Sequence, residues 1–80
     1  MDETRARLIK CFETVFPDMP AEEIPNATQS SVAGWDSIAA ITLINVIEEE
    51  FQITLDLEMA GELDSFSKIL EYLRTTAVNA

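Results

Sequence analysis

The strongest constraint on this chain is the apolar pattern of residues 37–51, SIAAITLINVIEEEF. The pattern follows the i, i+3, i+4, i+7 spacing of an amphipathic helix. The core face that this spacing defines consists of Ala40, Leu43, Ile44, Ile47 and Phe51. Three further apolar residues, Ile38, Ile41 and Val46, lie off that face. A helix that is apolar beyond its core face is either buried on more sides or binds another molecule.

The chain before this helix divides into a second helix and a long loop. Residues 3–16 repeat apolar side chains at helical spacing, and Cys11 falls on the inward stripe as a small buried hydrophobe. Residues 17–35 contain all three prolines and a polar cluster, NATQSS. So long a connection in a small domain is usually functional or packed down by its own side chains. We expect an ordered loop with one helical turn at residues 21–24 and the anchors Met19, Ile24, Val32 and Trp35.

After residue 51 the pattern predicts a short extended connection and two more helical segments. One helical turn is expected around residues 57–60, closed by Gly61. The last helix is expected to begin at Ser65 and to face inward with Phe66, Ile69, Leu70 and Leu73. The fold class is therefore all-α, a small bundle of three longer helices plus one short helix. Its 80 residues predict a single domain, 1–80, because a second core has no room.

The formal net charge of −10 restricts the partners of the protein. All five Lys and Arg residues lie at or before Lys10 or at or after Lys68, so the centre of the chain is purely acidic. Such a field repels nucleic acid and anionic membranes and attracts protein partners with basic surfaces. No apolar run reaches membrane-spanning length, and residues 1–10 lack the apolar stretch of a secretory signal. We expect a cytoplasmic protein that acts as a monomer.

Absent residue types argue against an independent enzyme. The chain has no histidine, which excludes Ser–His and Cys–His nucleophile pairs and imidazole metal sites. It has two glycines, too few for a glycine-rich phosphate loop, and a single cysteine, which cannot form an internal disulfide. The nearest approach to a calcium loop begins at Asp56, but it has Ala60 and Ser67 where acidic ligands are required. We therefore expect no catalytic residues and no metal.

Three consecutive acids, Glu48, Glu49 and Glu50, occupy the last turn of the central helix. The carbonyl end of a helix already carries partial negative charge, so each exposed acid there costs about 0.3–1 kcal/mol. A sequence that breaks a local rule repeatedly often does so at a functional surface. The alternative is a solvated acidic edge that the fold tolerates, and the residues alone leave both interpretations open.

Two Asp-Ser pairs stand at predicted helix starts, Asp36-Ser37 and Asp64-Ser65. Both residue types favour such positions because their oxygens accept bonds from unpaired backbone N–H groups. Capping accounts fully for the second pair. The first pair follows a long loop and opens the helix with surplus apolar residues, and a helix N-terminus also suits a phosphate group. Ser37 is therefore either a cap or a handle for covalent modification.

The stretch EEIPNATQSSVAGWDSIAAITLINVIEEEF resembles the centre of an acyl carrier protein. The likeness includes the loop, the Gly-x-Asp-Ser-aliphatic motif and the Glu-Glu-Glu-Phe end, and the flanking helices agree in placement. The resemblance implies that Ser37 carries 4′-phosphopantetheine from coenzyme A, with Asp36 as the supporting residue. A phosphopantetheinyl transferase would attach the arm, whose thiol would hold acyl groups as thioesters and shuttle them between enzymes of fatty-acid, polyketide or other specialised biosynthesis.

The resemblance also implies roles for other positions. The residues that match the family's docking surface for acyl-activating, acyl-transferring or condensing enzymes are Ile38, Ile41, Glu48 and Glu49. The residues that match its acyl-chain pocket are Ile44, Ile47, Leu57 and Met59. Carriers of fatty-acid synthesis typically place further acids after the serine, where this chain has Ala39, Ala40 and Thr42. This departure, together with Trp35, is more similar to specialised stand-alone carriers.

Two alternatives remain. A peptidyl or aminoacyl carrier protein would share the fold and the serine and would differ in the enzyme that loads it. An acidic helical interaction adaptor without a prosthetic group would need Ser37 only as a cap, and would keep its function in Ser37→Ala.

Overall fold

The structure, a computed structural model, describes residues 3–56 and 58–76, with the side chain of residue 76 excepted. Three longer helices are present, α1 (Glu3–Val15), α2 (Ser37–Phe51) and α4 (Phe66–Thr76). Two short ones accompany them, the 3₁₀ helix η1 (Ala21–Asn26) and α3 (Met59–Glu62). Extended pairing in the described ranges is limited to one isolated bridge between Thr28 and Ser65. The all-α prediction is therefore confirmed.

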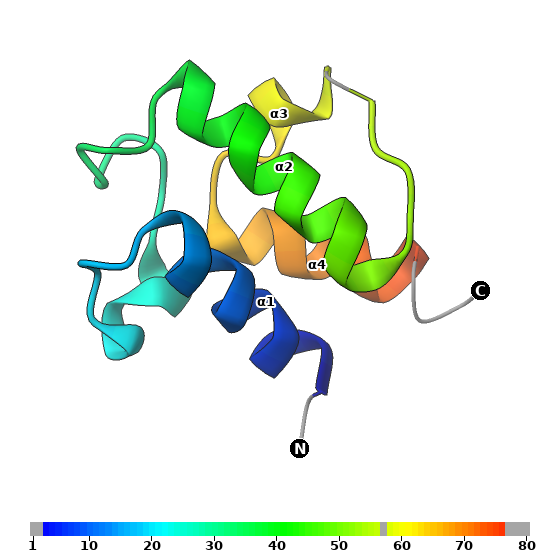
Figure 1. The fold of residues 1–80 in the computed structure, drawn as a ribbon, viewed down its shortest axis with the longest axis horizontal. Helices are drawn as coiled ribbons and strands as arrows, with labels where there is room; N and C mark the ends of the chain where they lie inside the picture. Colours follow the sequence, from blue (N-terminus) through cyan, green and yellow to red (C-terminus); the bar gives the residue numbers. More distant parts are fainter. Residues whose placement is uncertain (1–2, 57, 77–80) are drawn as a thin grey trace.

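Helix α2 crosses the molecule above α1 and α4 (Figure 1). It packs against α1 and α3, while α1 also packs against α4, and η1 contacts both α1 and α4. The predicted bounds of the central helix agree with those observed. Helix α1 ends at Val15, one residue before the predicted end, although the Phe16 N–H still donates to the Phe12 carbonyl at 2.7 Å.

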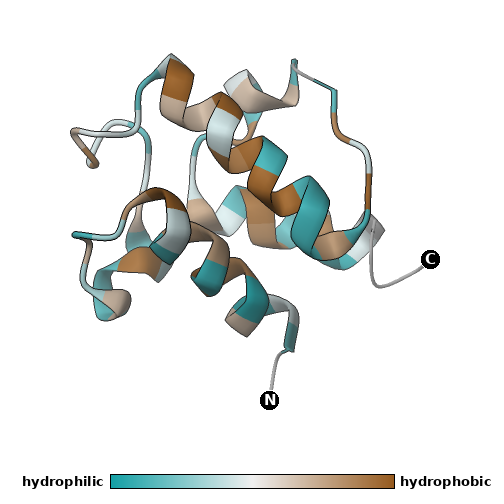
Figure 2. Cartoon of the chain, in the orientation of Figure 1, coloured by the Kyte–Doolittle hydropathy of each residue, from teal (hydrophilic) through white to brown (hydrophobic). Residues whose placement is uncertain are grey.

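The core gathers the inward faces of the three longer helices (Figure 2). These helices contribute Leu8, Cys11, Phe12, Ala40, Leu43, Ile44, Ile47, Phe66, Ile69 and Leu73 as buried residues. The predicted inward faces are thus confirmed except at Phe51 and Leu70, which are only partly buried. Each of these two stands at the edge of its apolar stripe. Every helix in the described ranges is too short or too polar to span a lipid bilayer.

Cys11 is 2 % exposed within this core. Burial raises the pKa of its thiol from 9.0 to about 11, and the negative charge of Glu50 adds to the effect. A thiol of this kind stays protonated and is a poor nucleophile at neutral pH. The interpretation of Cys11 as a small buried hydrophobe is confirmed.

The first loop is ordered by apolar anchors. Ile24 and Trp35 are buried, and Met19 and Val32 are partly buried against the core, as predicted. The helical turn expected at residues 21–24 is the 3₁₀ helix η1, which extends to residue 26. The loop is also joined to the start of α4, because the Phe66 N–H donates to the Ala27 carbonyl at 3.0 Å.

The connection after α2 begins with a left-handed residue, Gln52, at φ 56°. Its predicted short helical turn is α3, but Gly61 lies inside that helix and does not close it. The helix ends instead at Leu63, whose N–H donates to the Met59 carbonyl at 2.7 Å. Gly61 has no positive φ, so its conformation does not require glycine. Leu57 lies outside the described residues.

Candidate functional site

Helix α2 begins with a division of roles between Asp36 and Ser37. The Asp36 backbone is extended, and its Oδ1 accepts a hydrogen bond from the Ala39 N–H at 2.8 Å. Its carbonyl accepts the first helical bond, from the Ala40 N–H at 2.9 Å. Asp36 is therefore the N-cap of α2. Ser37 is the first helical residue; it is exposed, and its hydroxyl makes no hydrogen bond to the part of the chain that the structure describes.

The second Asp-Ser pair is arranged differently. Ser65 Oγ accepts from the Lys68 N–H at 3.1 Å, and the Ser65 carbonyl accepts from the Ile69 N–H. Asp64 forms an ion pair with Lys68 at 3.0 Å. Ser65 is thus the cap of α4, as predicted, whereas capping does not occupy the hydroxyl of Ser37. The same dipeptide serves two purposes because the register of each helix differs by one residue.

The approach to Ser37 is held by an aromatic cluster. Trp35 is 2 % exposed and packs edge-on against Phe12, with ring centroids 5.4 Å apart, and against Phe16 at 5.8 Å. Its backbone N–H donates to the Val32 carbonyl at 3.0 Å. Trp35 Nε1 is buried and has no hydrogen-bond partner among the described residues. The packing of Trp35 on α1 fixes where α2 starts, and so fixes the position of Ser37.

Beside Ser37, α2 presents an apolar surface to solvent. Ile38 is 76 % exposed and Ile41 is 41 % exposed, and they are the large hydrophobic residues that stand out on the described surface. Thr42, Asn45 and Glu49 are exposed as well. At about 100° per residue all of these point to one side of the helix. The surplus apolar residues at 38 and 41 therefore face solvent, while Val46 packs against the core.

The three glutamates at the end of α2 have different surroundings. Glu50 forms an ion pair with Arg7 of α1, with Arg7 Nε and Glu50 Oε2 2.9 Å apart. Glu48 Oε2 accepts a hydrogen bond from the Leu55 N–H at 2.6 Å and so holds the connection to α3. Glu49 is exposed. Two of the three acids thus have intramolecular partners, which offset their unfavourable place at the helix end. Sequence reasoning missed Arg7, because no local pattern links positions 7 and 50.

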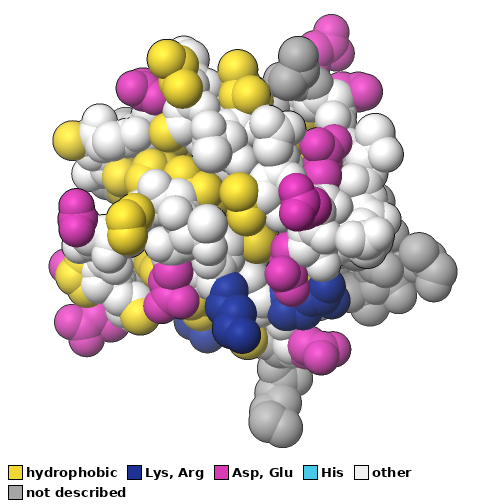
Figure 3. Space-filling model, in the orientation of Figure 1, with side chains coloured by type: hydrophobic (Ala, Val, Ile, Leu, Met, Phe, Trp, Pro, Cys, Tyr) yellow, Lys and Arg dark blue, Asp and Glu magenta, His cyan; other side chains and the backbone are white. Residues whose placement is uncertain are grey.

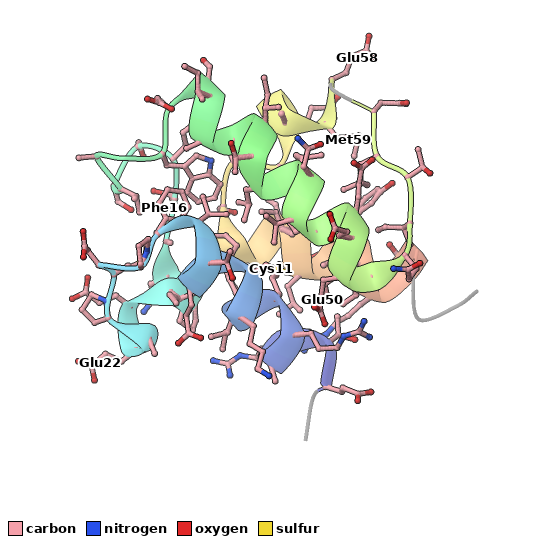
Figure 4. All side chains as sticks on the ribbon, viewed as in Figure 1. Cys11, Phe16, Glu22, Glu50, Glu58 and Met59 are labelled. Atoms are coloured by element: carbon pink, nitrogen blue, oxygen red, sulfur yellow. The ribbon has the colours of Figure 1, made fainter. Side chains whose placement is uncertain are left out.

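The predicted acyl-pocket residues lie where α2 meets α3, but two of them are closed off. Ile44 and Ile47 are fully buried in the core, and Met59 is partly buried against it (Figure 4). Leu57, the fourth, is outside the described residues. For an acyl chain to enter here, the core between these side chains would have to open. The pocket remains a prediction.

A groove of about 730 Å³ lies elsewhere, between the end of α1, η1 and the loop before α2. Figure 3 shows hydrophobic side chains between α1 and that loop, with acidic side chains around them. Sequence reasoning did not find this groove. Its walls come from three segments whose contact depends on the packing of the loop, so no local pattern could have revealed it.

The fold and the site define a small helical domain that presents a free serine at a helix N-terminus. A family model described as a phosphopantetheine attachment site matches residues 6–73. The mitochondrial acyl carrier protein of Saccharomyces cerevisiae is 33 % identical over 67 residues. That match covers 82 % of this chain and 54 % of the yeast protein, so the chain spans about half the length of this relative. No solved structure matches the chain.

The chain therefore belongs to the acyl carrier family of phosphopantetheine-binding domains, as the resemblance implied. Domains of this family are carriers and not enzymes, and their cofactor is covalently attached 4′-phosphopantetheine. The residues present fit that group, because the exposed Ser37 hydroxyl has no competing intramolecular bond and stands at the positive end of a helix dipole. Among the described residues no cluster of three or more His, Cys, Asp or Glu side chains could hold a metal ion.

Proposed function

We propose that Ser37 carries the 4′-phosphopantetheine arm and that the protein transfers acyl groups, held as thioesters, between the enzymes of a biosynthetic pathway. The observation that supports this most directly is the division of roles at the start of α2. Asp36 accepts the capping bond at 2.8 Å and leaves the Ser37 hydroxyl exposed. A serine needed only for capping would occupy the position that Asp36 already holds.

In the attachment reaction, Ser37 acts as the nucleophile. Its Oγ would attack the pyrophosphate of coenzyme A, form the new phosphodiester bond and release adenosine 3′,5′-bisphosphate. Its proton would pass to a base of the transferase, since the carrier has no histidine. When attached, the arm supplies the thiol on which acyl groups are carried. Asp36 would support the reaction by fixing the first turn of α2 and by placing a carboxylate beside the reacting oxygen.

We propose that partner enzymes dock on the exposed side of α2, through Ile38, Ile41 and the acids Glu48 and Glu49. The two isoleucines supply apolar contact area, and Glu49 is free to meet a basic side chain. Glu48 has one carboxylate oxygen bonded to the Leu55 N–H, so it would contribute mainly through its charge. Charges at the rim of an interface raise the encounter rate more than the affinity, which suits a carrier that visits several enzymes.

The proposed partners are a phosphopantetheinyl transferase and acyl-activating, acyl-transferring or condensing enzymes with basic docking surfaces. A peptidyl or aminoacyl carrier is the alternative within the same fold. The monomeric state and the exclusion of nucleic acid and membranes stay predictions from the charge of −10. The cytoplasmic location is also a prediction, and the similar yeast protein is named as mitochondrial.

The experiment that tests the attachment site is intact-mass spectrometry after incubation with coenzyme A, Mg²⁺ and a broad-specificity phosphopantetheinyl transferase. Wild type, Ser37→Ala and Ser65→Ala are compared. We expect one added phosphopantetheinyl group in wild type and Ser65→Ala and none in Ser37→Ala. If several transferases leave the folded wild type unmodified, Ser37 is not the handle and the adaptor alternative is favoured.

A further inference from the structure

The groove between α1, η1 and the first loop has its two ends in different parts of the molecule. Gly34 and Ala39, which flank Ser37 in the sequence, line one part of it. Glu22 and Glu23 of η1 also line it. In Figure 1 the start of α2 lies at the upper left and η1 at the lower left, and Figure 4 places Glu22 at the outer, lower edge. The groove therefore leads from the neighbourhood of Ser37 toward the acids of η1.

The chemistry of the groove changes along its length. Phe16, Val32 and Ala39 provide apolar lining, and three carboxylates, Asp18, Glu22 and Glu23, stand along the opposite part. None of the described residues that line the groove is a lysine or an arginine. An occupant with an apolar body and a positively charged end is complementary to this arrangement. A negatively charged end would be repelled by three carboxylates without a compensating cation.

We propose that this groove receives the acyl group tethered through Ser37, and that it favours short acyl groups that carry a protonated amine. The proposal rests on the proposed attachment at Ser37 and narrows the cargo to aminoacyl groups. The apolar part of the groove contacts the arm and the carbon chain of the cargo. The carboxylates of Asp18, Glu22 and Glu23 receive the ammonium group.

The tether makes weak interactions sufficient. Solvent-exposed ion pairs contribute little individually, and a free amine would not bind measurably to such a rim. A cargo fixed to Ser37 by a flexible arm is present at an effective concentration on the order of millimolar, whatever its concentration in solution. A small preference of the groove for the ammonium group then changes the fraction of time that the cargo spends inside it. The preference must weaken with salt, because exposed charges are screened.

The test compares cargoes that differ only in charge. The wild-type protein is loaded at Ser37 from propionyl-, β-alanyl- and malonyl-coenzyme A by a broad-specificity transferase, and loading is confirmed by intact mass. Backbone ¹⁵N–¹H spectra are recorded for each form. We expect the amides of Phe16, Val32, Gly34 and Ala39 to shift in the β-alanyl form relative to the propionyl form. These shifts should fall at least by half in high salt, and the malonyl form should lack them.

A matched pair of variants locates the effect. In Asp18→Asn/Glu22→Gln/Glu23→Gln the difference between β-alanyl and propionyl forms should disappear. The control changes three exposed acids outside the groove by the same net charge, Glu3→Gln/Glu13→Gln/Glu71→Gln, and should preserve the difference.

Several results overturn the proposal. Equal groove shifts in all three loaded forms of the wild type show that charge is not recognised, and this comparison needs no variant to fold. Persistence of the β-alanyl shifts in the groove variant shows that the ammonium group binds elsewhere. A wild type that accepts no arm removes the proposed function itself, and mass spectrometry separates that outcome from a loaded protein whose cargo ignores the groove.

Discussion

Arg7 of α1 and Glu50 of α2 form an ion pair at 2.9 Å across 43 positions of sequence. Arg7 also donates to the Glu50 carbonyl, and its guanidinium lies 4.6 Å from the centroid of the Phe51 ring. One side chain thus satisfies a carboxylate, a backbone carbonyl and an aromatic face at the C-terminal end of α2. The contact shows that the acidic end of this helix is partly an internal structural feature.

We expect Arg7→Ala to lower the free energy of unfolding by about 0.5–2 kcal/mol. The ion pair is more than a third exposed and contributes at most about 1 kcal/mol, and the cation–π contact adds a similar amount. The measurement is urea unfolding at low and high salt, and the loss should shrink when salt is added. Lys10→Ala, a change at an exposed position of the same helix, should stay within about 0.5 kcal/mol of wild type. Equal losses in the two variants would contradict the role of Arg7.

The two Asp-Ser pairs predict opposite behaviour in stability and modification. Asp36→Ala and Ser65→Ala each remove a capping oxygen and should cost about 0.5–2 kcal/mol of stability. Ser37→Ala removes no such bond and should stay within about 0.5 kcal/mol of wild type. Urea unfolding and intact-mass spectrometry of the same three samples check the prediction. A stability loss in Ser37→Ala as large as in Ser65→Ala would mean that Ser37 caps the helix.

Ile38 and Ile44 stand on opposite sides of α2 and should respond oppositely to truncation. Ile38→Ala should leave stability almost unchanged, because its side chain is 76 % exposed, yet raise KM for the phosphopantetheinyl transferase about fivefold, since truncating an interface residue commonly costs ~1 kcal/mol. Ile44→Ala should cost about 2–5 kcal/mol of stability, because it leaves a cavity in the core. Steady-state kinetics and thermal unfolding separate the two effects. An unchanged KM in Ile38→Ala would remove Ile38 from the docking surface of that enzyme.

The buried Cys11 thiol predicts a specific pH dependence. Its pKa is about 11 in the folded chain and 9.0 when unperturbed. Between these values the unfolded chain releases a proton that the folded chain keeps, so the free energy of unfolding falls as pH rises, by up to about 1.4 kcal/mol per pH unit. Below pH 9 this contribution is fully present. Urea unfolding of wild type and Cys11→Ala from pH 8 to 10.5 should show a steeper decline in wild type, and parallel curves would contradict the raised pKa.

Most of the helices follow from local patterns. Residues 37–51 combine a 3.6-residue apolar repeat with an Asp cap, and their predicted bounds are those observed. The Gly61 prediction was wrong because glycine often ends helices by adopting a positive φ, and at this position the backbone does not do so. The aromatic packing of Trp35 against Phe12 and Phe16 could be anticipated only as an anchor of the loop.

The sequence by itself determined the helical class, the central helix, the surplus isoleucines and the family, because each of these depends on residues close together in the chain. The tertiary structure decided which member of each Asp-Ser pair is the cap, since the register of a helix depends on how its loop packs. It also decided that Glu50 meets Arg7, that Glu48 holds Leu55, and that distant segments enclose the acidic groove. Contacts between residues far apart in sequence exist only once the core has brought their helices together.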